Sequence, residues 1–237
     1  MTVENVTLSN GIKMPLEGFG VFQVPDAAVC KQAVLDAISV GNRLIDTAAI
    51  YMNEEAVGDA VEEAIDTGLV KREELFITTK LWPSDMSYEG AKVAFERSLK
   101  KLKLDYLDMF MLHQPYGDVY GAWKAMVELY NEGKIKALGV ANFSIGKFTE
   151  FAEIVDVKPH VNQIELHPFF FAVCRHRKHE GLRHRPAGMG AARRRQTWYF
   201  HAPAPECHWR KVRQDRRPGG PQVECPARGF HYSEIRS

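Results

Sequence analysis

The sequence predicts an α/β protein built as an incomplete (β/α)8, or TIM, barrel of about six strands, with a small N-terminal hairpin. Three observations predict it. Short apolar runs alternate with amphipathic stretches over residues 1–170, the stretches are long enough to return the chain for a parallel strand, and polar side chains follow several of the runs. An open doubly wound sheet is the alternative.

The hairpin is predicted from Asn10-Gly11, which lies between the apolar runs Val6–Leu8 and Lys13–Pro15. This dipeptide is typical of a two-residue turn, in which both residues need a positive φ. We therefore expect two short antiparallel strands at the start of the chain.

Six buried strands and five helices are expected after the hairpin. The strands are predicted from apolar runs at Leu16–Phe19, Arg43–Asp46, Leu75–Lys80, Leu107–Leu112, Ile135–Val140 and His160–Glu165. The helices are predicted from a 3.6-residue apolar period at Ala28–Val40, Asn53–Thr67, Tyr88–Leu102, Val119–Glu132 and Ile145–Ile154. Units of this kind imply parallel strands with right-handed crossovers.

Two features favour the barrel over the doubly wound sheet. No G-x-G-x-x-G motif follows a strand, since Gly18-Phe19-Gly20 lacks the third glycine and leads into a polar loop. The polar residues of interest also lie at the carboxyl ends of successive strands, where barrel active sites are assembled.

Composition limits the classes of function. The chain has 237 residues, with 31 basic and 30 acidic side chains, a net charge of +1 that disfavours a nucleic-acid binder or a polybasic membrane protein. No run of about 18 apolar residues occurs, so no membrane partner is expected. Four cysteines, Cys30, Cys174, Cys207 and Cys225, form no CxxC pair, which favours a reducing, cytoplasmic setting.

Four side chains could carry chemistry. Asp46, Lys80 and His113 end three consecutive predicted strands, and Tyr51 follows the first of them. Each also has a structural explanation: the Asp as a helix cap, the Lys as a snorkelling side chain, the His as a hydrogen-bonded core residue and the Tyr as a packing residue. Their joint occurrence at one barrel end favours an active site.

These residues and their contexts resemble the aldo-keto reductase family, in its bacterial branch of 2,5-diketo-D-gluconate reductases. The matching segments and residues are GNRLIDTA at 41–48, Tyr51, Asn53-Glu54, TKLW at 79–82, LHQP at 112–115, GKIKALGVANF at 133–143 and NQIELHP at 162–168. The resemblance covers about residues 5–170 and implies an oxidoreductase that reduces aldehydes or ketones to alcohols with NADPH.

The resemblance implies a role for each catalytic candidate. Tyr51 would be the general acid that protonates the substrate carbonyl. Lys80 would lower the pKa of that phenol from its reference value near 10, and Asp46 would hold Lys80 in place. His113 would hydrogen-bond the carbonyl oxygen and orient the substrate, and Trp82 would line the substrate pocket or simply pack at the rim.

For the cofactor, the resemblance implies that the amides of Asn142 and Gln163 bind the nicotinamide carboxamide. The sequence departs from the family at Ala141, where a serine is usual, so one hydroxyl contact is lost and weaker cofactor positioning is expected. The identity of the carbonyl substrate, the preference for NADPH over NADH and the oligomeric state are not predicted.

The sequence after residue 170 differs from the preceding part in charge, arginine content and hydrophobic periodicity. Residues 1–170 carry a net charge of −9, whereas residues 171–237 carry +10 and hold 13 of the 16 arginines. We find no sustained period there, and stretches such as Arg193–Arg195 are not expected to build a barrel wall. A basic nucleic-acid-binding tail, a disordered linker and translation in a wrong reading frame are the three explanations.

The genetic code favours the wrong reading frame. With one base dropped and synonymous codons chosen freely, residues 207–222 can read as an amphipathic helix, and 223–235 as a strand ending in Ile-Pro-Lys-Ser, which resembles a cofactor motif of the family. Residues 194–201 allow a further family-like loop. We therefore expect a frameshift near residue 170, with 1–170 a partial barrel and 171–237 an out-of-frame, disordered tail.

A frameshift has three consequences. The lost motif would have held the 2′-phosphate of NADPH, so activity of this chain is in doubt. A non-catalytic barrel fragment with a binding or structural role is the alternative function. The cysteines and histidines of the tail would have no selected spacing, so no metal site is expected.

Overall fold

The computed structural model describes residues 4–165, 186–192 and 195–198. The chain divides into two units, Met1–Pro205 and Glu206–Ser237, and every described residue lies in the first. The expected domain boundary at residue 170 and the reading-frame prediction for 207–235 lie outside the described residues.

The N-terminal hairpin is present, but its turn differs from the expected one. Strands β1 (Asn5–Thr7) and β2 (Lys13–Pro15) pair antiparallel. The Gly11 N–H donates to the Leu8 carbonyl over 2.9 Å, and Gly11 has a φ of +86° whereas Asn10 does not have a positive φ. The expectation of two positive φ values is wrong, because the connection is longer than two residues and only its last turn position needs the left-handed region.

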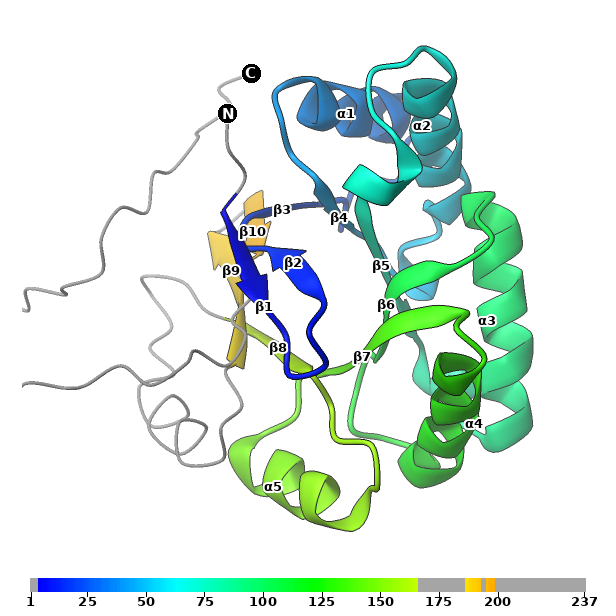
Figure 1. Ribbon diagram of the computed structural model, residues 1–237, viewed down its shortest axis with the longest axis vertical. Coiled ribbons are helices and arrows are strands. Elements are labelled where there is room, and N and C mark those ends of the chain that lie inside the picture. Colours follow the sequence, from blue (N-terminus) through cyan, green and yellow to red (C-terminus); the bar gives the residue numbers. More distant parts are fainter. Residues whose placement is uncertain (1–3, 166–185, 193–194, 199–237) are drawn as a thin grey trace, which may run out of the picture. The chain divides into compact units, whose positions relative to one another are not determined.

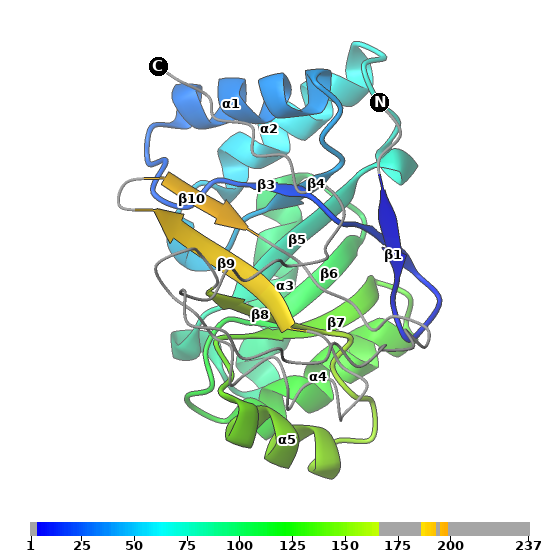
Figure 2. The same ribbon diagram turned by 90° about the vertical axis from the view of Figure 1, so that its left-hand side faces the viewer.

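Six parallel strands follow and form a curled sheet (Figures 1 and 2). In order across the sheet they are β3 (Gly18–Gly20), β4 (Leu44–Asp46), β5 (Phe76–Leu81), β6 (Leu107–Leu112), β7 (Ile135–Ala141) and β8 (Val161–Glu165). Each strand pairs with the next one along the chain. This arrangement confirms the incomplete barrel.

Five helices cover the outer face of the sheet (Figure 1). They are α1 (Ala27–Ser39), α2 (Glu54–Asp66), α3 (Tyr88–Leu102), α4 (Val119–Asn131) and α5 (Ile145–Ile154), all within two residues of the predicted bounds. Side chains of Asp26, Ser87, Asp118 and Ser144 accept a backbone N–H in the first turn of α1, α3, α4 and α5, which explains where these helices begin. No described helix has the length and apolarity to span a membrane.

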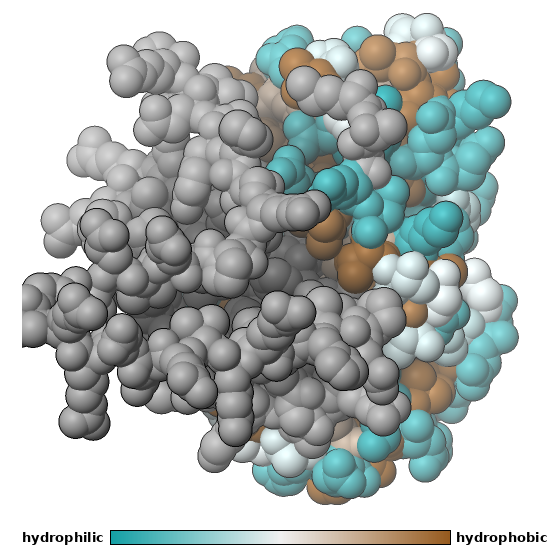
Figure 3. Space-filling model, turned by 60° about the vertical axis from the view of Figure 1, so that its left-hand side comes forward, coloured by the Kyte–Doolittle hydropathy of each residue, from teal (hydrophilic) through white to brown (hydrophobic). Residues whose placement is uncertain are grey.

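The sheet separates two apolar clusters. The larger one fills the space between the strands and the helices, whereas the smaller one lies on the inner face and includes Met109, Met111 and Phe76. Met14 of the hairpin belongs to the inner cluster, so the hairpin closes the amino-terminal end of the strands. The described surface seen in Figure 3 is mainly hydrophilic, with smaller hydrophobic patches between.

Two further strands extend the sheet beyond the six. β9 (Pro186–Ala192) pairs parallel with β8, and β10 (Arg195–Trp198) pairs antiparallel with β9. The expectation that the segment around Arg195 does not contribute to the barrel sheet is therefore wrong, because its backbone pairs as a strand from Arg195 onward. A ladder requires only backbone N–H and C=O groups, so it can form without the alternating pattern that predicts strands from sequence.

Candidate active site

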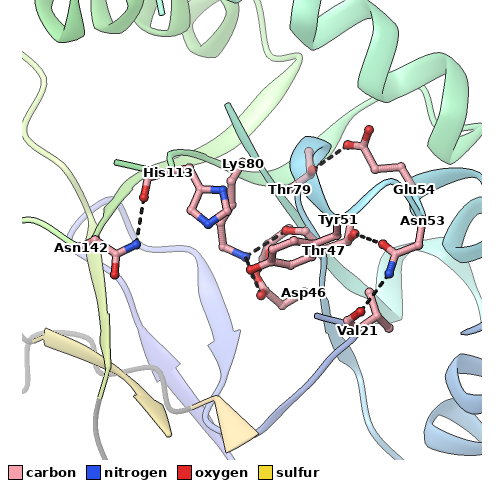
Figure 4. Close-up of polar contacts among 11 residues, drawn as sticks. Val21, Asp46, Thr47, Tyr51, Asn53, Glu54, Thr79, Lys80, His113 and Asn142 are labelled. Atoms are coloured by element: carbon pink, nitrogen blue, oxygen red, sulfur yellow. Dashed lines mark hydrogen bonds and ion pairs between the residues drawn. The ribbon is translucent and has the colours of Figure 1, made fainter. Parts of the chain in front are cut away.

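The structure brings the four candidate catalytic residues together. Asp46 is the last residue of β4, Lys80 is next to last in β5, and His113 directly follows β6, so adjacent parallel strands place them at one edge of the sheet (Figure 4). Tyr51 ends the short 3-10 helix η1 (Ala49–Tyr51) that follows β4.

The ammonium group of Lys80 joins these elements. Its Nζ lies 2.6 Å from Asp46 Oδ2 and donates to the Thr47 carbonyl over 2.9 Å and to the Tyr51 hydroxyl over 3.3 Å. The side chains of Lys80 and Asp46 have no exposed area. The second carboxylate oxygen of Asp46 accepts the Thr78 hydroxyl at 2.5 Å, so both oxygens have partners. The pair is therefore held in one geometry from two strands.

Tyr51 has an aromatic environment on one side and a charged one on the other. Its ring lies 4.8 Å from the Phe22 ring and 5.6 Å, edge-on, from the His113 ring. Burial of the phenol, and secondarily the carboxylate of Asp46, raises the pKa of Tyr51 above its ordinary value. The expected net lowering of this pKa is not found, because burial of the phenol and the Asp46 carboxylate both disfavour the phenolate and the Lys80 ammonium does not outweigh them.

His113 is a neutral imidazole. Burial, together with the charge of Lys80, lowers the pKa of His113 to about 3. Its Nδ1 is buried and has no hydrogen-bond partner among the described residues. The ring of Trp82 lies 5.0 Å from the His113 ring in an edge-on arrangement, so Trp82 is beside the cluster.

The two residues expected to hold a cofactor lie on the neighbouring strands. Asn142 follows β7 with a φ of +62°, its N–H donates to the Gln163 carbonyl over 2.8 Å, and its Nδ2 donates to the His113 carbonyl over 3.0 Å. Ala141, opposite Gln163 in the ladder, is buried and offers no hydroxyl. The end of β7 therefore links His113 to β8.

The side chain of Gln163 is suited to a carboxamide ligand. Both its Oε1 and its Nε2 are buried without a hydrogen-bond partner among the described residues. Gln163 is two residues beyond Val161 in β8, so the two side chains lie on the same face of the sheet. Val161 belongs to the inner cluster, and Gln163 therefore also lies on the inner face. A buried primary amide with neither bond made is unfavourable by about 1–3 kcal/mol per group, unless a ligand supplies a donor and an acceptor. The residues present thus fit a nicotinamide carboxamide.

Two residues near Tyr51 were not identified from the sequence. Phe22 packs on the phenol, and Asn53 joins three segments through its buried amide. An Asn just before an amphipathic stretch predicts a helix cap, yet Asn53 makes no side-chain capping bond to α2. The only signal for Asn53 was its place in the matching text, and for Phe22 there was none.

Metal chemistry has no centre within the described residues. They contain no group of three or more His, Cys, Asp or Glu side chains that could hold a metal ion. The cysteines and histidines of the tail lie outside the described part of the chain. Within that part, the site brings together the protonated phenol of Tyr51, the neutral imidazole of His113 and the buried ammonium of Lys80, which is paired with a carboxylate.

Comparison with known proteins gives consistent results. Residues 18–190 match the sequence model of the Aldo/keto reductase family. The chain is 47% identical to glyoxal reductase of Bacillus subtilis, over 70% of this chain and 59% of that protein, and 46% identical to methylglyoxal reductase DkgA of Escherichia coli, over 69% and 58%. The chain thus spans less than two thirds of the length of these curated relatives.

Solved structures agree in fold. An aldo-keto reductase of Bombyx mori in complex with NADP superposes with a TM-score of 0.76 at 32% identity, covering 81% of this chain and 67% of that one. An aldo/keto reductase from Brucella melitensis gives a TM-score of 0.72 at 38% identity, covering 76% and 70%.

Proposed function

The chain belongs to the aldo-keto reductase family, and we propose that it is an NADPH-dependent oxidoreductase that reduces aldehydes or ketones to alcohols, with Tyr51 as the general acid. The observation that carries the proposal is the Lys80 ammonium, which contacts both the Asp46 carboxylate and the Tyr51 hydroxyl. Homologues named as reductases of small carbonyls support it.

The proton comes from Tyr51. With its raised pKa the phenol is protonated at neutral pH, as an ordinary tyrosine is, so it has a proton to donate to a carbonyl oxygen that approaches its hydroxyl. Lys80 acts after that transfer: its Nζ, 3.3 Å away, stabilises the phenolate that is left behind. Asp46 keeps Lys80 in position through both events.

His113 and Trp82 bind and orient the substrate. With a pKa of about 3, His113 is uncharged at neutral pH and donates one N–H to the carbonyl oxygen without adding a charge. Trp82, 5.0 Å from that ring, provides an apolar wall. We propose small carbonyl compounds as substrates, and dicarbonyls such as methylglyoxal in particular, because relatives are named for the reduction of such compounds.

NADPH, when bound, supplies a hydride to the carbonyl carbon. Asn142 and Gln163 would hold its carboxamide, Gln163 through the two buried polar atoms that have no partner among the described residues. Two structural neighbours are complexes with NADP or NADPH, which supports this choice of cofactor. Ala141 has no hydroxyl where the family usually has a serine, so this edge of the sheet offers one contact fewer. We therefore expect weaker binding of the nicotinamide.

The competing proposal is a non-catalytic barrel fragment that acts by binding. The observation that favours it is that the match to the family model ends at residue 190 of this chain. The proposed setting is the cytoplasm, with no nucleic-acid or membrane partner.

The test is NADPH oxidation by the purified 237-residue chain with methylglyoxal, followed at 340 nm, after the coding DNA around residue 170 has been resequenced. Turnover that is lost in Tyr51→Phe and kept in Tyr120→Phe supports the reductase. Tyr120 lies on α4, so its variant controls for loss of a phenol hydroxyl elsewhere. NADPH binding without turnover would favour the binding fragment, and absence of both would reject the cofactor proposal.

A further inference from the structure

We propose that Asn53 is a positioning residue, whose buried side-chain amide fixes the Phe22 side chain against the Tyr51 phenol. The inference deepens the proposed function, because it assigns a role next to the group that donates the proton.

Asn53 joins three segments of the chain. Its Nδ2 donates to the Val21 carbonyl over 2.8 Å, and its Oδ1 accepts the Thr47 hydroxyl at 2.9 Å (Figure 4). The same Nδ2 donates to the Val24 carbonyl over 3.2 Å. The side chain is buried, with 3% of the residue exposed. Both ends of the amide are thus used within the protein, and none of its bonds caps α2.

The two carbonyls bound by Nδ2 lie at the two ends of one tight turn. The Val24 N–H donates to the Val21 carbonyl over 3.3 Å, and between them Gln23 has a φ of +62°. A non-glycine residue in this region is disfavoured by about 1–2 kcal/mol, so the turn needs support from its surroundings. Asn53 gives that support by holding both ends.

Phe22 is the other central residue of this turn. The turn therefore decides where its ring lies, which is 4.8 Å from the Tyr51 ring at an angle of 48°. Because Asn53 is only two residues beyond Tyr51, one side chain fixes the distance between the phenol and the aromatic residue that covers it.

The opposite end of the Asn53 amide connects to the charged side of the site. Thr47, whose hydroxyl donates to Asn53 Oδ1, also accepts the Lys80 ammonium through its carbonyl over 2.9 Å. Asn53 therefore lies between the two environments of Tyr51, the Phe22 ring and the Lys80–Asp46 pair. A helix cap alone would not need either connection.

Asn53→Leu removes all three hydrogen bonds and introduces no charge. The Val21 and Val24 carbonyls then lose their shared donor, the turn relaxes, and Phe22 moves away from the phenol. Misplacement of a catalytic group by about 1 Å can cost on the order of 100-fold in rate, so we expect kcat to fall by about that factor while KM for NADPH is little changed.

Asn10→Leu is the matched control. Asn10 also donates its Nδ2 to a backbone carbonyl, that of Lys136, over 2.9 Å, but it does so from the hairpin turn at the other end of the barrel. This variant loses a comparable bond and should reduce stability without changing the site.

The deciding measurement needs no cofactor. The full chain is labelled at the tyrosine Cζ with carbon-13, the Tyr51 signal is assigned with Tyr51→Phe, and its ionisation is followed from pH 9 to 10.5. In the described part of the chain, the charged and titratable groups found beside Tyr51 are Asp46, Lys80 and His113, and all are kept in the variants. We expect Tyr51 to remain un-ionised in the wild type and Asn10→Leu, and to titrate towards its ordinary pKa of about 10 in Asn53→Leu.

Thr47→Val and Thr47→Ser form a second, milder pair. Thr47→Val removes the hydroxyl that donates to Asn53 Oδ1, whereas Thr47→Ser keeps a hydroxyl there. The apparent pKa of Tyr51 should therefore shift in Thr47→Val and match that of the wild type in Thr47→Ser. Identical titration in the wild type, Asn53→Leu and Thr47→Val overturns the inference. A wild-type chain that does not oxidise NADPH overturns the proposed function instead, and leaves the titration to decide the role of Asn53.

Discussion

Lys80 and Asp46 form an ion pair that has no contact with solvent: Nζ and Oδ2 are 2.6 Å apart and both side chains have zero exposed area. Burial lowers the pKa of Lys80, and the carboxylate of Asp46 opposes that shift. Loss of either partner would leave a buried charge uncompensated. The pair is therefore as important to stability as to the proposed chemistry.

Asp46→Ala should destabilise the protein by about 3–5 kcal/mol, because the Lys80 ammonium is left buried without its counter-ion. The double variant Asp46→Ala, Lys80→Met removes both charges and should recover much of that loss. Urea denaturation of Asp46→Ala, Lys80→Met and the double variant measures the coupling. A loss in the double variant equal to the sum of the losses in the two single variants would show that the charges are not coupled.

Stability should fall in acid because of His113. Its pKa is about 3 in the folded chain and about 6.5 when unfolded, so between these values the unfolded chain binds more protons. The free energy of unfolding is therefore unaffected by His113 above pH 6.5 and decreases as the pH falls from 6.5 towards 3, by at most about 1.4 kcal/mol per unit.

Denaturation of the wild type and His113→Gln at several pH values from 7 to 4 isolates this effect. The carboxylates contribute equally to the pH dependence of both proteins, so the difference between the two profiles is due to His113. The wild type should lose stability more steeply. Parallel pH profiles would mean that His113 is accessible to protons in the folded state.

The conformation of Met52 predicts a stabilising substitution. Met52 follows Tyr51 with a φ of +59°, and it is 77% exposed, so its side chain contributes little burial. Glycine removes a backbone penalty of about 1–2 kcal/mol, although it adds about 0.4–1 kcal/mol of unfolded-state entropy. Met52→Gly should raise the thermal midpoint slightly, whereas Ile50→Gly, without a positive φ, should lower it.

Two helical glycines should respond oppositely to alanine. A Cβ on Gly58 in α2 would lie 2.5 Å from the Lys101 carbonyl oxygen and 2.8 Å from the Leu102 carbonyl carbon, both backbone atoms of the α3 segment that cannot rotate away. A Cβ on Gly146 in α5 would meet no atom within 4 Å. Gly58→Ala should cost about 1–3 kcal/mol, while Gly146→Ala should gain up to about 1 kcal/mol through helix propensity. Chemical denaturation of both variants gives the signs.

The convergence of Asp46, Lys80 and His113 could be predicted from sequence because it depends only on topology. Each follows an apolar run, and parallel neighbours present their carboxyl ends at the same edge. Periodicity similarly predicted all five helices to within two residues. These features are local patterns repeated along the chain.

The features that were not predicted depend on contacts between distant residues. The bond from Asn53 to Val21 spans 32 positions, and nothing in either local pattern indicates it. The raised pKa of Tyr51 results from burial and, secondarily, from the carboxylate of Asp46, and the extent of burial is not revealed by the local sequence. The pairing of β9 uses backbone groups, which leave no sequence period.

Gln163→Leu should separate stability from cofactor binding. Leucine is comparable in size to glutamine but has no polar atoms. It therefore removes two buried groups that have no partner among the described residues and places an apolar side chain beside the inner cluster. Without cofactor, the variant should be more stable by about 1–3 kcal/mol. The same substitution removes the proposed carboxamide contact, so NADPH should stabilise the variant less than it stabilises the wild type. Thermal unfolding with and without NADPH measures both effects on the same sample. A variant that is less stable without cofactor would show that the Gln163 amide already has partners in the folded chain, because only the loss of existing hydrogen bonds reverses the sign.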